Sequence, residues 1–180
     1  MINQIKGLHH VTSLASDARE NNAFFTNVLG LRRIKKTVNF DAPDVYHLYY
    51  GDEEGSPGTV MTYFPFPNAG RGAKGIGEVG RTAFSIPTGS AKAWLDRFAA
   101  FDMKGMTQDT RFGQNRVLFD GPDGDQFALV ESDNDRTPWT GNGVSAEMGI
   151  RGFHSADMRL KDAGVSGELL QFMGYEKLDT

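Results

Sequence analysis

An internal repeat is the feature that most constrains how this chain can fold. The segment Gly7-Leu8-His9-His10 aligns with Gly152-Phe153-His154-Ser155, and the same alignment places Asp17 on Asp162. A similar succession of elements starts near Thr82. The sequence therefore predicts an internal repeat, with two complete copies and a third that stops at Thr180.

The first copy is predicted to be a strand, a helix and three further strands. Residues 8–15 favour a strand, and Ser16-Asp17 supplies an N-cap for a helix that Gly30 would end. Three β-rich runs follow, at residues 31–40, 45–50 and 59–64. The order is therefore β-α-β-β-β.

The second copy follows the same order. Residues 82–86 favour a strand, and Ser90 is predicted to cap a helix with apolar side chains at helical spacing, at positions 91, 94, 95, 98 and 99. Three short strands are expected at residues 110–112, 117–120 and 126–131. We therefore expect modules at 1–66 and 78–132, an incomplete third module at 150–180, and an α+β fold whose mixed sheets form open barrel-like cups.

Composition excludes several classes of site and partner. The 180 residues carry a net charge of -4, which disfavours binding to nucleic acid or to an anionic membrane surface. The chain has no cysteine, so a metal would need imidazole, carboxylate and water ligands. No apolar run is long enough to span a bilayer, and the first residues lack the apolar core of a signal peptide. A cytoplasmic location is the expectation.

The histidine doublet His9-His10 is the first candidate site. Neighbouring side chains on a strand point to opposite faces, so His10 shares a face with Thr12 while His9 points away. His9 could reach the same cavity only if the strand twists or ends there. Taken without further context, both could be ordinary strand histidines with satisfied hydrogen bonds.

Several motifs, taken together, resemble one family. They are residues 5–12, 46–52, 58–65, 111–113 and 150–154. Together they are similar to the hydroquinone-type ring-cleaving dioxygenases of the vicinal oxygen chelate superfamily, which also includes glyoxalase I and the bleomycin- and fosfomycin-resistance proteins. The resemblance implies an Fe(II) or Mn(II) cofactor bound by His10, with His9 and Thr12 assisting catalysis, and a small aromatic substrate.

His47 and Tyr49 are the candidate substrate-binding residues. They lie in an aromatic run, Tyr46-His47-Leu48-Tyr49-Tyr50, which could form the wall of a pocket for a ring. The alternative is an aromatic-rich core strand, because aromatic residues favour strands in any case. His154 aligns with His9 rather than with His10, so we expect a structural role for it.

The chain departs from the family where the other metal ligands should be. Such iron sites need two histidines and one carboxylate, and in the resembled family the second histidine and the glutamate come from a fourth module. Arg81 and Ser155 occupy the positions equivalent to His10, and Thr62 and Ala128 occupy the last-strand positions of the glutamate. Glu131 should point to the opposite face from Ala128, as a solvated strand-end charge. We therefore expect an incomplete metal site, as in a fragment of a dioxygenase.

Two other functions stay open. A glyoxalase-like isomerase or lyase would need the last-strand glutamates that Thr62 and Ala128 replace. A non-catalytic module that binds an aromatic ligand or a partner is compatible with a third module that stops after its helix. The apolar face of that helix would then need a cover, so we expect a homodimer; the apolar residues are Leu169, Leu170, Phe172 and Met173.

Overall fold

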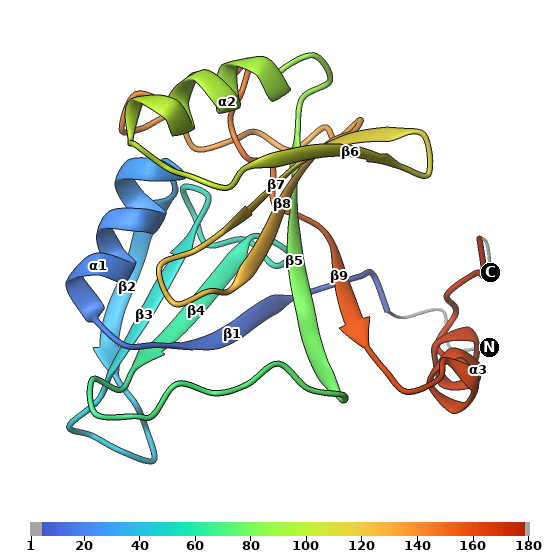
Figure 1. Cartoon of the computed structure of the whole chain (residues 1–180), viewed down its shortest axis with the longest axis horizontal. Coiled ribbons are helices and arrows are strands. Elements are labelled where there is room, and N and C mark those ends of the chain that lie inside the picture. Colours follow the sequence, from blue (N-terminus) through green and yellow to red (C-terminus); the bar gives the residue numbers. More distant parts are fainter. Residues whose placement is uncertain (1–4, 179–180) are drawn as a thin grey trace.

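A computed structural model describes residues 5–178, and its strands form two mixed sheets (Figure 1). The first sheet has the order β1-β4-β3-β2, with β1 parallel to β4 and the other pairs antiparallel. Its strands are β1 (His10–Ala15), β2 (Arg32–Val38), β3 (Tyr46–Gly51) and β4 (Val60–Pro65). The first copy of the repeat thus forms one sheet.

The second sheet has the order β6-β7-β8-β5-β9. Four strands come from the second copy: β5 (Glu78–Ile86), β6 (Thr107–Arg111), β7 (Gln114–Asp120) and β8 (Gln126–Glu131). The fifth, β9 (Phe153–Arg159), comes from the third copy and runs antiparallel along the outer edge of β5. The first strand of one copy is therefore paired with the first strand of the next.

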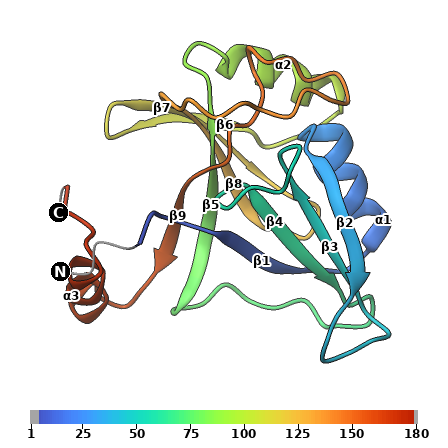
Figure 2. The same cartoon turned by 180° about the vertical axis from the view of Figure 1, so that it is seen from behind.

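Each sheet carries its helix on one face. Asp17 caps α1 (Ala18–Ala23) as predicted, because its carboxylate accepts hydrogen bonds from the backbone N–H groups of Arg19 and Glu20. The helix continues as a π-helical turn, η1 (Phe24–Val28), and Gly30 follows with a φ of +68°, the left-handed conformation that ends helices. Seen from behind, α1 lies alongside β2 and β3 (Figure 2).

The helix-bearing faces of the two sheets share one core. Phe25 of η1 stacks on Tyr50 of β3, while Phe24 contacts Phe127 of β8, with ring centroids 4.8 and 6.0 Å apart. In α2 (Ala91–Ala100), Arg97 donates to the carbonyls of Asn27 and Val28 at the end of η1. The two modules are thus packed through their helix-bearing faces.

Two expectations about α2 need correction. Ser90 does not cap the helix, because its hydroxyl donates to the carbonyl of Pro87. Glu131 is not a solvated charge: it is 9% exposed and accepts from the backbone N–H of Ala91 and from the amide of Asn115. Strand alternation placed Glu131 on the correct face, but that face is covered by the start of α2.

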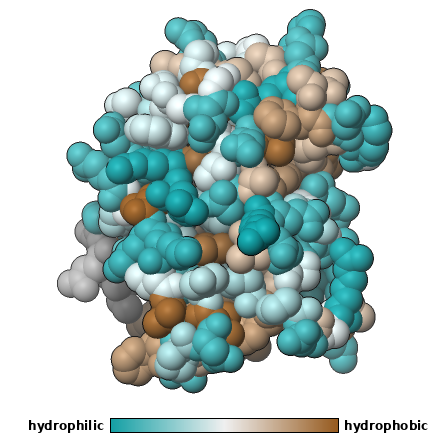
Figure 3. Space-filling view, turned by 90° about the vertical axis from the view of Figure 1, so that its left-hand side faces the viewer, coloured by the Kyte–Doolittle hydropathy of each residue, from teal (hydrophilic) through white to brown (hydrophobic). Residues whose placement is uncertain are grey.

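The expected α+β class is confirmed, with two mixed sheets, few helices and no closed barrel in the described part of the chain. The third helix, α3 (Gly164–Phe172), lies apart from both sheets at the end of β9 (Figures 1 and 2). On the side of α1 and β2, the surface is mostly hydrophilic with scattered apolar spots (Figure 3). Among residues 5–178, no helix is long and apolar enough to cross a membrane.

Candidate functional site

The face of the first sheet that turns away from α1 carries the candidate residues. Along β3 and β4, Leu48, Tyr50, Met61 and Tyr63 are buried on the helix side. Alternation therefore places the intervening side chains on the open face. These are His10 and Thr12 on β1, Thr62 and Phe64 on β4, and His47 and Tyr49 on β3.

Strand register brings Thr12, Thr62 and Tyr49 into one row across this open face. Thr12 lies opposite Thr62, and Thr62 lies opposite Tyr49. The two threonine hydroxyls are 2.8 Å apart and form a hydrogen bond. Thr62 is only 2% exposed, and its hydrogen bond holds the side chain of Thr12 on the neighbouring strand in place. Sequence reasoning considered Thr62 only as the place of a missing glutamate; the parallel pairing of β1 with β4 is what would have revealed this contact.

His47 sits in an aromatic group with Tyr49 and Phe64. Its ring centroid lies 4.1 Å from that of Tyr49 and 4.0 Å from that of Phe64. The Tyr49 hydroxyl is 2.7 Å from His47 Nδ1, at hydrogen-bonding distance. His47 Nε2 is buried and has no hydrogen-bond partner among the described residues. A buried ring nitrogen without a partner is costly, so this atom is available to a ligand.

The pKa of His47 lies below its ordinary value. Burial is the largest cause, and the nearby positive charges of His10 and Lys35 lower the pKa further. The lowered pKa favours the neutral imidazole, in which one ring nitrogen is a donor and the other an acceptor. The hydrogen bond between the Tyr49 hydroxyl and Nδ1 determines whether Nε2 is the donor or the acceptor.

His9 and His10 are closer than strand alternation alone predicts. β1 begins at His10, so His9 is outside the strand and its direction is not set by the pleat. The two Nδ1 atoms are 3.0 Å apart and the rings meet edge to face. The structure thus realises the alternative in which His9 reaches the same region because the strand ends there.

The described residues do not fit a complete metal site. No group of three or more His, Asp or Glu side chains lies close enough to hold an ion within residues 5–178. Besides His10, the open face carries threonine hydroxyls, the rings of Tyr49 and Phe64, and the imidazole of His47, but no carboxylate from the residues that the structure describes. A mononuclear site of two histidines and a carboxylate would need ligands from outside these residues.

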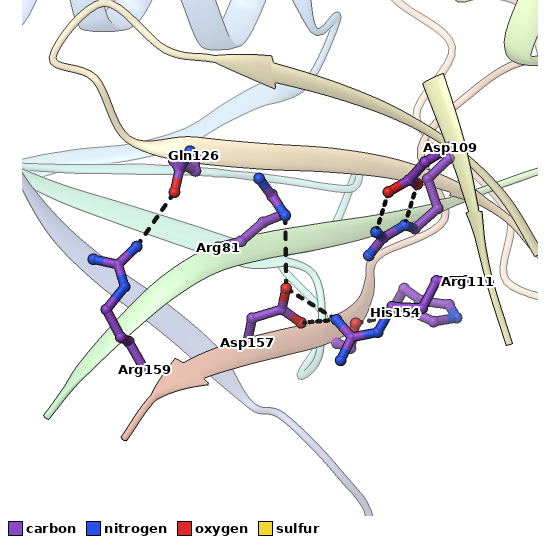
Figure 4. Close-up of polar contacts among 9 residues, drawn as sticks. Arg81, Asp109, Arg111, Gln126, His154, Asp157 and Arg159 are labelled. Carbon is purple, nitrogen blue, oxygen red and sulfur yellow. Dashed lines mark hydrogen bonds and ion pairs between the residues drawn. The ribbon is translucent and has the colours of Figure 1, made fainter. Parts of the chain in front are cut away.

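Sequence reasoning missed a second group of polar residues on the second sheet. Arg81 of β5, Arg111 of β6 and Asp157 of β9 converge at one end of this sheet (Figure 4). His154, expected to be structural, lies on the same strand as Asp157 and is 3.0 Å from the amide oxygen of Gln114. The pairing of β5 with β9 creates this group, and no local pattern in the sequence indicated it.

The class of protein follows from comparison with known families. Residues 7–129 match the Glyoxalase/Bleomycin resistance protein/Dioxygenase superfamily. Since the match spans more than half of the chain, the chain belongs to this superfamily. The resemblance stated from the sequence motifs is confirmed.

The relatives narrow the class further. The chain is 39% identical over 175 residues to "Putative ring-cleaving dioxygenase MhqE" of Bacillus subtilis, a match covering 96% of this chain and 57% of MhqE. It is 36% identical over 157 residues to chlorohydroquinone/hydroquinone 1,2-dioxygenase of Sphingobium indicum, covering 84% of this chain and 49% of that enzyme. A crystal structure titled as a putative dioxygenase from B. subtilis superposes with a TM-score of 0.92 at 38% identity, covering 97% of this chain and 56% of that one. The chain thus spans about half the length of these relatives.

Proposed function

We propose that this chain forms one part of a metal-dependent ring-cleaving dioxygenase that acts on hydroquinone- or catechol-like aromatics. The observation that carries the proposal is the open face of the first sheet. It combines the exposed imidazole of His10 with a half-buried aromatic group that has one unsatisfied ring nitrogen. The names of the relatives support the same activity.

The roles we propose follow from the chemistry of each side chain. His10 contributes one ligand to Fe(II) or Mn(II), while His9 and Thr12 hold His10 and the substrate in place. The rings of Tyr49 and His47 stack against the substrate ring. His47 Nε2 bonds a ring hydroxyl, and the Tyr49 hydroxyl fixes the tautomer of His47. Thr62, opposite Thr12 on the neighbouring strand, holds the Thr12 side chain in place through a hydrogen bond.

The remaining metal ligands would come from a strand placed against β1. β9 covers the outer edge of β5, the first strand of the second module, and Asp157 faces Arg81 there. Arg81 is the position equivalent to His10. The corresponding edge of β1 is the end of its sheet, unpaired within the described residues. We propose that a strand outside the described residues pairs with this edge and brings the second histidine and the carboxylate beside His10.

For partners, we propose a small aromatic substrate, no nucleic acid or membrane, and a second copy of the chain. The net charge of -4 disfavours polyanions. An isomerase or lyase of the glyoxalase type is less well supported, because Thr62 and Ala128 stand at the last-strand positions of its glutamates.

Titration of the chain with catechol, followed by amide NMR, tests the site. We expect saturable shifts on β1, β3 and β4. Tyr49→Phe removes the hydroxyl that orients His47, and should weaken binding roughly fivefold, the equivalent of one hydrogen bond. Tyr46→Phe is the matched control, since Tyr46 lies on the same strand and contacts Lys36 instead. Equal affinities for the two variants would contradict the proposed role of the open face.

A second arm of the same experiment adds Mn(II), a paramagnetic ion that broadens the NMR signals of nearby amides. Broadening should centre on the start of β1 in the wild type and disappear in His10→Ala. Broadening that persists in this variant would refute the ligand role of His10, independently of the result with catechol.

A further inference from the structure

A cavity lies at the second sheet, between the end of β9, the strand β5 and the helix α3. Its volume is about 540 Å³. Three arginines line it: Arg81, Arg111 and Arg159. Figure 4 shows Arg81 and Arg111 pointing at the same carboxylate, Asp157, while Arg159 reaches toward Gln126.

The charges in this cavity do not cancel. Arg159 is paired with Glu78. Arg81 and Arg111 share the single carboxylate of Asp157, which leaves one positive charge in excess. Arg111 takes most of that carboxylate, with Nη1 3.2 and 3.3 Å from its two oxygens, whereas Arg81 Nη1 is 3.8 Å away, too far for a hydrogen bond.

Arg81 is consequently a guanidinium without acceptors. Its side chain is 23% exposed, and none of its five N–H donors is hydrogen-bonded within the described residues. The Nε atom is fully buried. Burying such donors unpaired is costly, and a planar oxyanion matches their geometry with two parallel hydrogen bonds.

The lining of the cavity also includes apolar side chains: Met158 of β9, Leu160 just after it and Leu170 of α3. Bare phosphate would leave these side chains without contacts, whereas a ligand with a hydrocarbon body would cover them. We propose that this cavity binds a small organic carboxylate, held by Arg81 and Arg111, with its apolar body against Met158, Leu160 and Leu170. The site lies on the second sheet and is independent of the dioxygenase proposal.

Amide NMR on the whole chain tests this site with three probes at constant ionic strength. Benzoate supplies both the carboxylate and the ring, benzamide is its neutral isostere, and inorganic phosphate is an oxyanion without an apolar body. We expect saturable benzoate shifts at the amides of Gly80 and Gly167, which line the cavity. Benzamide should not saturate, and phosphate should bind more weakly than benzoate.

Arg81→Gln should weaken benzoate binding roughly tenfold, as expected for loss of a charge-assisted pair. Arg111→Gln should also weaken benzoate binding. Because Arg111 is more exposed than Arg81, this variant tests the site even if Arg81→Gln does not fold. Arg19→Gln is the control, because Arg19 is exposed on α1 of the first module and makes no ion pair within the described residues.

Four results would overturn the proposal. Benzamide binding as well as benzoate would mean an apolar pocket without charge recognition. Phosphate binding more tightly than benzoate would assign a different ligand class. Unchanged affinity in both the Arg81 and the Arg111 variants would place the benzoate elsewhere. Shifts confined to β1, β3 and β4 would likewise report the aromatic face and not this cavity.

Discussion

At the scale of single residues, Asp125 is a largely buried carboxyl group with two side-chain hydrogen bonds. It lies where the two modules meet and accepts hydrogen bonds from Ser13 of β1, at 3.1 Å, and from the Tyr63 hydroxyl of β4, at 2.8 Å. Burial is the main cause that raises the pKa of Asp125 above its ordinary value of 3.8. The nearby Asp123 raises it further, and the two hydrogen bonds oppose the rise. A carboxylate thus contributes to the contact between the modules at some electrostatic cost.

This environment predicts a pH-dependent stability. A raised pKa in the folded state means that folding favours the protonated carboxyl. The contribution of Asp125 is therefore greatest below pH 3.8, and it is lost as pH rises through the raised pKa. Asp125→Asn should remove this loss, which urea unfolding from pH 3 to pH 7 would measure. Asp41→Asn, at an exposed loop position, should leave the pH profile unchanged. Parallel profiles for wild type and Asp125→Asn would contradict the argument.

Tyr63→Phe tests the same contact from the other side. It leaves Asp125 Oδ2 without its donor, and should lower the free energy of unfolding by about 1–3 kcal/mol at pH 7. The same denaturant experiment measures it, with Tyr46→Phe as the exposed control. A loss no larger than that of the control would show that water replaces the tyrosine hydroxyl.

At the scale of elements, the start of α2 shows how a distant strand completes a helix. Glu131 at the end of β8 accepts the N–H of Ala91 at 2.9 Å, and this negative charge also suits the positive end of the helix dipole. Glu131→Ala should cost about 1–3 kcal/mol. Ser90→Ala should cost less, because the Pro87 carbonyl still accepts the backbone N–H of residue 90. Thermal unfolding of both variants tests whether Glu131 caps the helix. A larger loss of stability for Ser90→Ala than for Glu131→Ala would refute this role of Glu131.

The same element shows why part of the structure could be predicted from the sequence and part could not. The stripe that buries Trp94 and Phe98, the Asp17 cap and the strand at 126–131 are local patterns, and the structure has them. β5, in contrast, begins at Glu78 rather than residue 82, because Met158 and Arg159 extend its pairing. Partners about 80 residues away leave no local trace. The same holds for the Arg81–Asp157 group.

The candidate site divides in the same way. Alternation within β1 sufficed to propose that His10 shares a face with Thr12. His47 and Tyr49 are grouped only because both lie in one aromatic run. The contact between Thr62 and Thr12 depends on the pairing of two strands, in which these residues are 50 positions apart in the sequence. The contact of His9 with His10 depends on where β1 begins, and strand ends are the least predictable feature of a pattern.

At the scale of the whole molecule, the packing of the modules through their helix-bearing faces explains why the two sites that we propose lie on different sheets. The shared core uses the helix-bearing faces of both sheets. Each opposite face is left for a ligand or a further strand. The second sheet has gained β9 from the next copy, while β1 remains at the edge of the first. The second sheet therefore includes a strand from another copy of the repeat, whereas the first sheet, within the described residues, does not.

The outer face of α3 carries exposed apolar side chains. Val165, Leu169 and Phe172 lie at helical spacing and are 80%, 57% and 61% exposed. Such an apolar stripe on an isolated helix favours association, as we propose for a homodimer. Light scattering at tens of micromolar should give the mass of two chains, and Leu169→Gln with Phe172→Gln should give one. Phe40→Gln removes an even more exposed ring, 95% accessible, from the loop after β2, and should leave the mass unchanged. A monodisperse wild-type monomer would contradict the homodimer.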